Sequence, residues 1–357
     1  MNPFSPTFDF HKDSFINNDV NFLRNIKLSL SQLGNPWRTT FILGMRRSGK
    51  TTLLSYLKQQ LSSEKDTVVI SFNSSPNILV DILAELQDRL SKKTIDKLNL
   101  SFTAFGLSAG IDLKDKNKFP SFQLDLKKIL EEFKKQGLSV LLLLDEVQNN
   151  TQELRTLFSA YKIVYSEYQI NIVAAGLPSA IDSLINDDAL TFLLRSNRIE
   201  LEPLTYESIL MSYKKLFNSR NVTLEQLQTM TEATSGYPFV YQLIGYYVWN
   251  ESEDAPVTDE IIDGAIKFAR KALFDQVYSK VYSDLPNTPR ELVLAIHELG
   301  DHQVSNKQIQ DKLGWDLNKV SSYKATLTHW GIIEKEGYGI TGFKPPYFDQ
   351  FLDYYFS

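Results

Sequence analysis

One short segment of the chain combines glycine, lysine and threonine at a spacing that suits phosphate binding. It is GMRRSGKT, residues 44–51, and it matches the pattern G-x-x-x-x-G-K-[ST]. Phosphate oxygens only accept hydrogen bonds, so a binding loop must aim several backbone N–H groups inward, and glycine lets the backbone turn tightly. The pattern arises by chance in about one in a hundred chains of this length. A predicted strand before the segment and a predicted helix after it favour a phosphate loop over chance.

The residue types within this segment predict separate tasks. Lys50 is expected to reach the β- and γ-phosphates of ATP, and the Thr51 hydroxyl is expected to bind Mg²⁺. The helix that begins near Lys50 adds the positive end of its dipole. The predicted ATP-binding residues are Gly44, Arg47, Ser48, Gly49, Lys50, Thr51 and Thr52.

A second candidate for chemistry is LLLLDE, which ends in Asp145 and Glu146. Asp145 closes a predicted buried strand, where an unpaired carboxylate is costly. At the carboxyl edge of a parallel sheet, Asp145 would join Thr51 as a magnesium ligand. Glu146 would then be the general base that polarises the attacking water, with Lys50 as the second catalytic residue. The alternative is an ordinary strand end with acidic residues in the following turn.

Two arginines precede the fifth predicted strand, in the segment DDALTFLLRSNRIEL. Arg195, ahead of Arg198, is a candidate catalytic residue that would reach the γ-phosphate bound by a neighbouring subunit. This interpretation implies a homo-oligomer. The alternative is a solvated arginine paired with Asp187 or Asp188.

Short apolar runs that alternate with amphipathic stretches predict the elements that position these residues. The runs are residues 39–43, 67–72, 138–146, 170–176 and 197–204. The middle runs are apolar almost throughout, which is typical of strands buried on both faces. The alternation predicts an α/β fold with a parallel five-stranded sheet covered by helices on both sides. Residues 100–121 break the rhythm and fit either a β-hairpin or a flexible insertion.

Beyond Leu204 the pattern becomes helical, which predicts three domains: an α/β core at 1–204, a helical lid at 205–284 and a third domain at 285–357. In the third domain, three helical patterns and a glycine-rich hairpin predict a winged helix-turn-helix. Ser305 is a candidate N-cap and Gly314 a candidate C-cap of its second helix. The aromatic-rich end of the chain favours a docking helix over a stacking platform for bases.

The second helix of a helix-turn-helix pair lies in the major groove of DNA. The residues predicted to contact double-stranded DNA are Asn318, Lys319, Ser321, Ser322 and Lys324 on that helix and Tyr338 at the tip of the hairpin. From residue 289 onward, seven lysines and arginines stand against nine aspartates and glutamates, which predicts weak DNA binding by this domain alone. Winged helices also bind proteins, and a protein partner is the alternative.

The composition of the 357 residues excludes several classes of function. The net charge of −5 gives no global positive field, so a role with nucleic acid must depend on a local patch. The absence of cysteine excludes disulfides, thiolate zinc sites and a cysteine nucleophile. No signal peptide and no apolar run long enough to cross a membrane is visible, so we expect a soluble cytoplasmic protein.

The phosphate-loop motif, the DE pair, five strands, a helical lid and a winged helix resemble the AAA+ ATPases of the origin-recognition initiator type and the related STAND-like prokaryotic ATPases. The match looks closer still to a bacterial family of ATP-binding proteins with an origin-recognition-like AAA domain. The segments that carry this resemblance are NPFSPTF, AAGLPSAIDSLINDDALTFLLRSNR, TSGYPFVYQLIGYYVW and VSSYKATLTHWGIIEKEGYGITGFKPPYF. The resemblance implies an AAA+ P-loop fold, with ATP and Mg²⁺ as cofactors.

The chain departs from that family in three places. Such proteins often have a Gly-Arg pair before the phosphate loop, where this chain has Asn17 and Asn18. The fourth predicted strand ends in small residues and then Ser179, where a γ-phosphate sensor needs a longer polar side chain. Initiators commonly have an arginine in the lid motif, which here is the arginine-free segment at 236–239. The missing lid arginine favours slow hydrolysis or a role for ATP mainly as a switch, and the change at Asn17 and Asn18 affects the expected contacts with adenine.

The sequence therefore predicts an ATP- and Mg²⁺-dependent switch that controls a winged-helix effector. Two alternatives stay open. One is a signalling or defence ATPase whose winged helix binds protein, and the other is a nucleotide-binding scaffold that does not hydrolyse ATP.

Overall fold

The computed structural model describes residues 2–7, 14–16, 21–98, 100, 120–147, 151–252, 256–300 and 302–357. Asn17, Asn18 and most of the predicted insertion at 100–121 lie outside these ranges. The chain forms two compact units, one made of residues 19–43 and 50–201 and the other of 1–18, 44–49 and 202–357. The three-domain division stays a prediction. None of the helices in the described ranges has the length and apolar character needed to cross a membrane.

The first unit, here called the α/β unit, is built on the predicted parallel five-stranded sheet. Its strands are β1 (Thr39–Leu43), β2 (Thr67–Asn73), β3 (Ser139–Val147), β4 (Ile170–Gly176) and β5 (Asn197–Glu200). Their order is β2-β3-β4-β1-β5, and every pairing is parallel. All residues of β1 and β4 are buried, and the almost continuous apolar pattern of β4 predicts this. The carboxyl ends of the strands share one edge of the sheet, where ligands bind in such folds.

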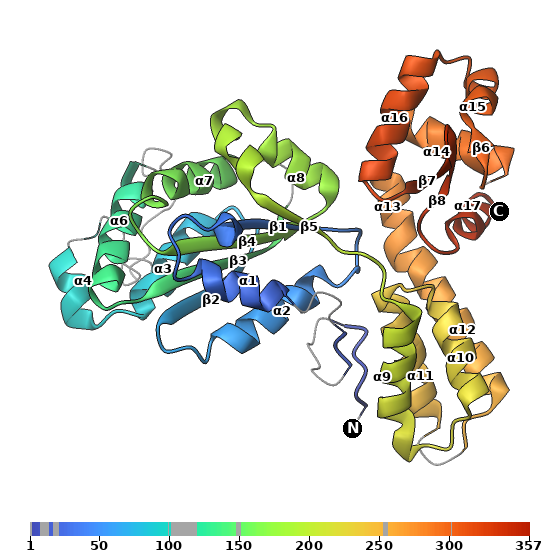
Figure 1. Ribbon diagram of the computed structural model, residues 1–357, viewed down its shortest axis with the longest axis horizontal. Coiled ribbons are helices and arrows are strands. Elements are labelled where there is room, and N and C mark those ends of the chain that lie inside the picture. The colour runs from blue at the N-terminus through green and yellow to red at the C-terminus, as the bar shows by residue number, and fades with distance from the viewer. Residues whose placement is uncertain are drawn as a thin grey trace. The chain divides into compact units, whose positions relative to one another are not determined.

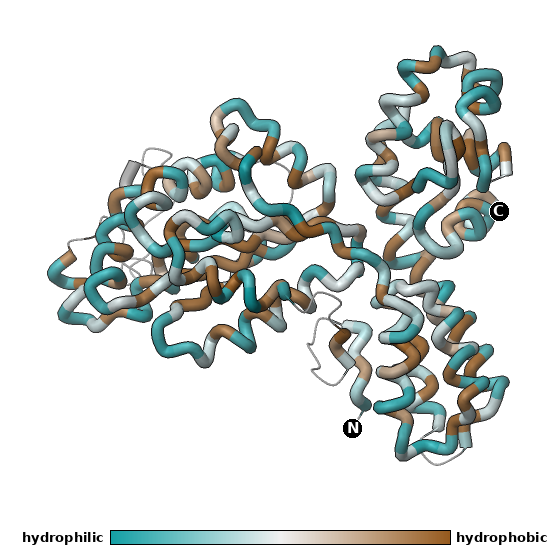
Figure 2. The backbone as a smooth tube through the Cα atoms, in the orientation of Figure 1, coloured by the Kyte–Doolittle hydropathy of each residue, from teal (hydrophilic) through white to brown (hydrophobic). Residues whose placement is uncertain are grey.

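Helices cover both faces of this sheet, with α1 and α2 on one side and α7 and α8 on the other (Figure 1). The helical elements are α1 (Phe22–Ser29), η1 (Pro36–Arg38), α2 (Lys50–Leu61), α3 (Ile78–Asp88), α4 (Lys92–Leu98), α6 (Pro120–Lys135), α7 (Gln152–Val164), α8 (Pro178–Ile185) and η3 (Asp188–Arg195). The apolar faces of α3, α6, α7, α8 and η3 form a continuous core with one face of the sheet, and α2 buries four leucines of its own. The hydrophobic residues follow the strands of the sheet (Figure 2). This core fixes the edge of the sheet at which Asp145 and Glu146 lie.

The second unit, here called the helical unit, begins its long helical run at α9. Its first helices are α9 (Tyr206–Leu216), η4 (Phe217–Ser219), α10 (Leu224–Thr234), α11 (Pro238–Glu251) and α12 (Asp259–Leu273). Side-chain caps set several starts, including a capping box in which Thr223 and Gln226 satisfy each other's backbone N–H groups. A π-helix, η5 (Phe274–Tyr278), joins α12 to α13 (Ser279–Asp284), and sequence patterns did not predict it.

The start of the chain packs into this helical unit. Phe4 is buried, and its ring lies 5.6–5.8 Å from the rings of Tyr213, Phe217 and Tyr241. A Cβ atom at Gly245 of α11 would lie 2.5 Å from the Phe4 ring, so this helix needs glycine there. The first residues are therefore part of the core of the helical unit.

The last part of the helical unit contains helices and a small antiparallel sheet. The elements are α14 (Asn287–Leu299), β6 (Val304–Ser305), α15 (Asn306–Leu313), α16 (Leu317–His329), β7 (Ile333–Gly337), β8 (Ile340–Phe343) and α17 (Phe348–Phe356). The sheet order is β6-β8-β7. Ser305 caps α15 in a capping box, and Gly314 ends it in the left-handed conformation. The three helices and the β7–β8 hairpin lie at the predicted positions, and their assignment as a winged helix-turn-helix stays a prediction.

The aromatic C-terminal helix α17 packs within the chain. Phe348 and Phe351 are buried, and the Phe351 ring lies 5.9 Å from Phe274 of the π-helix. The Phe348 ring lies 5.1 Å from Tyr278. Two of the five aromatic side chains of α17 are thus buried, whereas Tyr354, Tyr355 and Phe356 are exposed. The role of α17 as a docking helix stays a prediction.

Candidate functional site

The candidate phosphate loop, residues 44–49, connects β1 to α2 and has an unusual backbone. Arg47 and Gly49 have positive φ angles of 57° and 97°, with Ser48 between them. The Ser48 N–H donates to the carbonyl of Met45 at 3.3 Å. Left-handed residues in alternation turn successive backbone N–H groups toward one side, which is how anion-binding nests form. This backbone fits the predicted phosphate cradle.

The loop also leaves room for an anion. An added Cβ at Gly49 would have Pro238 Cγ, at 4.0 Å, as its nearest neighbour. Two buried polar atoms of the loop, Ser48 Oγ and Arg46 Nε, have no hydrogen-bond partner among the residues that the structure describes. Buried polar atoms are normally satisfied, so these two call for a ligand or an ordered water. The loop therefore fits a phosphate group.

The residues that follow the loop form the first turn of α2. Lys50, Thr51 and Thr52 are half-buried there, and α2 packs against β3 in the same unit. The first N–H groups of a helix have no intrahelical acceptor and carry partial positive charge. Lys50 and the start of α2 follow the loop directly in the chain, and their contact with phosphate stays a prediction.

Asp145 and Glu146 lie at the carboxyl end of β3, where the strand is irregular. Pairing with β4 shifts between Leu144 and Val147, so β3 contains one extra residue at this point. Glu146 is exposed and has a φ of 51°, and its N–H donates to Asp145 Oδ1 at 2.8 Å. A left-handed glutamate is rare and costs conformational energy, which favours a functional reason for its position.

A metal ion at this edge would use few protein ligands. Mg²⁺ commonly takes one or two carboxylates and fills its shell with water and phosphate oxygens. Among the described residues, no three acidic or histidine side chains come together that could hold a metal by themselves. Asp145 and the Thr51 hydroxyl, which lie on packed elements of one unit, therefore suit Mg²⁺ that arrives with a nucleotide.

One polar residue at this edge was not predicted. The β2–β3 pairing places Asn73, the last residue of β2, beside Asp145, and its side chain is exposed. The only sequence signal for Asn73 is its position directly after the apolar run at 67–72, and this position alone does not indicate a functional residue. The neighbouring strand β4 ends at Gly176, where an added Cβ would lie 2.8 Å from the Val147 carbonyl oxygen. A sensor side chain therefore has no space at that position, and Ser179 is exposed in the first turn of α8.

Arg195 ends η3 with an exposed side chain, and Arg198 is exposed on β5. Asp187, one of the expected partners, pairs through Oδ2 with Arg155 at 2.7 Å. The Arg195 side chain has no hydrogen bond or ion pair with any described residue. The expected ion pair between Arg195 and Asp187 or Asp188 is therefore not formed. The role of Arg195 toward a second subunit stays a prediction.

The arginine-free lid segment contacts the phosphate loop directly. The Tyr237 hydroxyl donates to the carbonyl of Arg46 at 2.5 Å, and the Arg47 guanidinium stacks over the Phe239 ring at 4.2 Å. Arg47 Nη1 also donates to the carbonyl of Pro6 at 3.2 Å. Burial lowers the pKa of Arg47. The Arg47 side chain is therefore engaged by Phe239 and Pro6, which leaves its backbone N–H for the predicted contact with phosphate.

The predicted DNA-contacting residues divide into two groups. Asn318, Lys319, Ser321 and Ser322 are exposed on α16, and Tyr338 is fully exposed between β7 and β8. Lys324 is half-buried, and its ammonium donates to Asn306 Oδ1 at 2.7 Å and to the Gly339 carbonyl at 3.2 Å. Burial, followed by the charge of Lys335, lowers the pKa of Lys324. Lys324 therefore links α16 to the hairpin, and Lys319, which stacks on Trp315 at 4.1 Å, is the more exposed cation.

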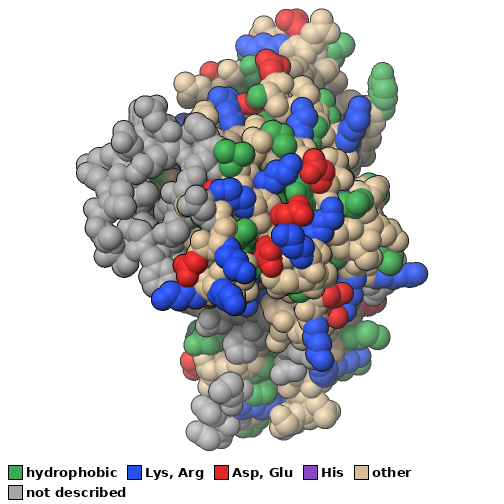
Figure 3. Space-filling view, turned by 90° about the vertical axis from the view of Figure 1, so that its left-hand side faces the viewer, with side chains coloured by type: hydrophobic (Ala, Val, Ile, Leu, Met, Phe, Trp, Pro, Cys, Tyr) green, Lys and Arg blue, Asp and Glu red, His purple; other side chains and the backbone are tan. Residues whose placement is uncertain are grey.

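The basic residues described on α4 do not form a patch of one sign. Lys92, Lys93 and Lys97 are exposed on α4, next to the exposed Asp88 and Asp96. Figure 3 shows lysine and arginine side chains interspersed with carboxylates across this face of the described structure. Such a mixture weakens the local field, so this face does not have the electrostatic footprint of a nucleic-acid binder.

Family comparisons cover two parts of the chain. Residues 38–184 match a family model described as "AAA domain", and residues 275–352 match a "Domain of unknown function (DUF8462)". The first match includes the phosphate loop, Asp145 and Glu146. No curated protein matched the sequence.

A comparison with solved structures bears on the fold. The chain is similar to the ORC2 protein of Aeropyrum pernix, solved as ADPNP–ADP complexes, with 11% identity, a TM-score of 0.61 and coverage of 96% of this chain and 97% of that chain. A Cdc6p from Pyrobaculum aerophilum is 15% identical with a TM-score of 0.48, over 94% of this chain and 93% of that chain. The fold is that of a P-loop AAA+ ATPase, as the sequence predicts.

Proposed function

We propose that this chain is an ATP-dependent switch that controls its C-terminal winged-helix region. The observation that carries the proposal is the loop at 44–49, with positive φ at Arg47 and Gly49 and an unsatisfied Ser48 hydroxyl, which continues directly into Lys50 and Thr51. The AAA domain match over the same residues supports ATP as the ligand. So does the fold shared with ORC2, a protein solved with ADPNP and ADP.

In this proposal each residue has one task in the reaction of ATP and water to ADP and phosphate. Lys50 and the loop N–H groups bind the β- and γ-phosphates and offset their growing negative charge. Glu146 accepts the proton of the attacking water, a role that its exposed left-handed position suits. Thr51 and Asp145 would hold Mg²⁺, which neutralises phosphate charge when it is bound.

The missing sensor side chains make turnover slow. Gly176 leaves no room for a polar residue, and residues 236–239 contain no arginine. Binding then matters more than hydrolysis, and ATP shifts the conformation only as far as it contacts one state better than the other. Exposed Arg195 is the residue through which ATP would favour self-association.

Calorimetry with ATP tests the site. Lys50→Ala should weaken ATP binding about 100-fold or more, because it removes the charge that pairs with two phosphates. Lys58→Ala, an exposed lysine on the same helix, is the matched control and should bind like the wild type. Equal binding by both variants would remove the basis of the proposal.

DNA is the partner that we propose for the winged-helix region. The support is the exposed polar face of α16, with Lys319 as its accessible cation, and the exposed Tyr338 at the hairpin tip. Fluorescence anisotropy with duplex DNA should show binding that weakens as salt rises and that depends on ATP. Lys319→Ala should weaken DNA binding equally for all DNA sequences. Lys307→Ala, an exposed lysine on α15, is the control and should bind DNA like the wild type.

A protein partner is the second candidate, favoured by a specific observation. The Lys324 ammonium donates its hydrogen bonds to Asn306 and Gly339 rather than facing a partner. The region from residue 289 also has more acidic than basic residues. Absent or salt-insensitive DNA binding would favour a signalling or defence ATPase. Phosphate release no faster than that of Glu146→Gln would instead favour a non-hydrolysing scaffold.

A further inference from the structure

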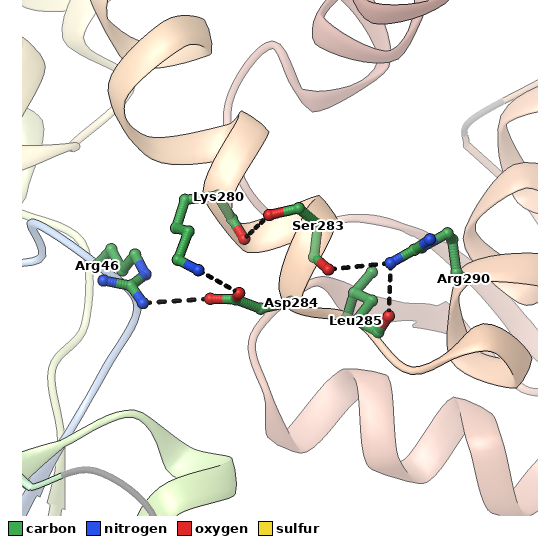
Figure 4. Close-up of polar contacts among 6 residues, drawn as sticks. All are labelled: Arg46, Lys280, Ser283, Asp284, Leu285 and Arg290. Carbon is green, nitrogen blue, oxygen red and sulfur yellow. Dashed lines mark hydrogen bonds and ion pairs between the residues drawn. The ribbon is translucent and has the colours of Figure 1, made fainter.

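Arg46, the third residue of the phosphate loop, makes an ion pair with the last residue of α13. Its Nη2 lies 3.2 Å from Asp284 Oδ2, and Lys280 Nζ lies 2.6 Å from Asp284 Oδ1 (Figure 4). Burial raises the pKa of Asp284, but hydrogen bonds from Lys280 and Arg46 outweigh this effect, and the net pKa lies below its usual value. Asp284 is therefore a charged group shared between a helix lysine and a loop arginine.

The Arg46–Asp284 pair has the properties of a contact that exchanges easily. It uses one nitrogen and one oxygen at the long end of the hydrogen-bond range, and the two side chains are 38% and 40% exposed. Such exposed single-contact pairs add little stability. Arg46 Nε is buried and has no partner among the described residues. A guanidinium binds a phosphate through two parallel N–H donors, so a phosphate would satisfy this Nε where Asp284 does not.

Asp284 also lies at the junction with the C-terminal region. Arg290 of α14 donates through Nη2 to the carbonyls of Ser283 and Leu285, at 3.0 and 2.8 Å, on either side of Asp284 (Figure 4). A second contact joins the loop to this region, because a Cβ at Gly331 would lie 3.5 Å from Met45 Cγ. Any movement of Asp284 is thus passed to α14 through the Arg290 hydrogen bonds.

We propose that Arg46 exchanges Asp284 for a phosphate of the bound nucleoside triphosphate, and that this exchange frees the end of α13 and the region that follows it. The inference rests on the proposed ATP binding at the loop and adds a ligand and a signalling route to it. A triphosphate carries more negative charge than a single carboxylate, and Arg46 moves toward it because the guanidinium gains a second hydrogen bond. Nucleotide binding and the Asp284 contact therefore oppose each other.

ATP affinity in paired variants tests the exchange. Asp284→Asn should tighten ATP binding about two- to fivefold, the range for loss of one exposed competing ion pair. Arg46→Gln should weaken ATP binding about tenfold, because a charge-assisted contact to phosphate is lost. The double variant should bind like Arg46→Gln, since Asp284 has no competitor role once Arg46 is gone.

Lys280→Gln is the matched control. It removes the other partner of Asp284 from the same helix without touching the loop, so it should leave ATP affinity unchanged or slightly weaker. Unchanged or weaker ATP binding by Asp284→Asn would overturn the exchange and identify the pair as a fixed tether. Such a result for Asp284→Asn overturns only the exchange when the wild type binds ATP and Lys50→Ala does not, because the proposed ATP site then stands. If the wild type binds no ATP, both proposals fall.

Hydrogen exchange supplies a readout that does not depend on affinity. In the wild type, ATP should speed amide exchange in peptides that cover residues 280–290, because the end of α13 loses its contact with the loop. In Arg46→Gln, exchange there should already be fast and should not respond to ATP. Slower or unchanged exchange in the wild type on addition of ATP would contradict the release step.

Discussion

The carboxyl end of β3 and the phosphate loop are positioned in different ways. β3 pairs with a parallel strand on each side, and these pairings hold Asp145 and Glu146 at a bulge near its carboxyl end. The loop is held by side chains from far along the chain, with Tyr237 191 residues and Asp284 238 residues from Arg46. We therefore expect hydrolytic chemistry to depend on the α/β unit, and nucleotide affinity to depend also on the helical unit.

The largest expected effect isolates the β3 side of this comparison. Glu146→Gln should slow phosphate release about 100-fold or more, the range for loss of a general base, while ATP affinity stays near the wild type. Glu200→Gln, an exposed acid at the carboxyl end of β5, is the control and should change neither quantity. A loss of ATP binding in Glu146→Gln would mean that the two sides are not separable.

The next effect addresses the loop backbone itself. Gly49→Ala should weaken ATP binding about 5- to 30-fold, because alanine is strained by about 1–2 kcal/mol at positive φ and relaxes to another loop shape. Gly34→Ala, with open space around its Cβ position, is the matched control. Wild-type affinity in Gly49→Ala would show that the left-handed backbone is not needed for binding.

A smaller effect tests the tie between the loop and α11. Tyr237→Phe should weaken ATP binding about two- to tenfold, since one hydrogen bond to the Arg46 carbonyl contributes about 0.5–1.5 kcal/mol. Tyr246→Phe on the exposed side of the same helix should have no effect. If both variants bind ATP equally well, the loop keeps its shape without the Tyr237 hydrogen bond, and the comparison fails on that side.

The smallest effect concerns the ring under Arg47. Phe239→Leu should weaken ATP binding about two- to fivefold, because a cation–π contact of about 0.5–1 kcal/mol is lost while an apolar side chain remains. The measurement is calorimetry beside the wild type at the same salt concentration. Tighter binding would mean that the stack holds Arg47 away from the phosphates.

Sequence patterns predicted the elements that depend on neighbours along the chain. The five strands of the parallel sheet were predicted from short apolar runs, although β5 has no buried residue. The caps Ser305 and Gly314 appear as local signals. Strand β6 was missed because two residues carry no periodicity. The π-helix at 274–278 was missed because its residues continue an ordinary helical pattern.

The candidate site was predictable only in its motif residues. Glycine, lysine and acidic residues at a fixed spacing identified the loop and the end of β3. Asn73 was missed because its place beside Asp145 comes from strand register. Arg46 was missed because its importance comes from Asp284, and nothing in the sequence pairs two residues that far apart.

The buried Phe4 ring fixes the start of the chain in the helical unit, so a change beside this ring can affect the phosphate loop. A Cβ atom at Gly245 would lie 2.5 Å from carbon atoms of the Phe4 ring, so the ring would have to move out of its buried position. Pro6, two residues further on, offers the carbonyl that Arg47 binds. Gly245→Ala would therefore act on the nucleotide loop by dislodging the beginning of the chain, although residue 245 itself is remote from phosphate.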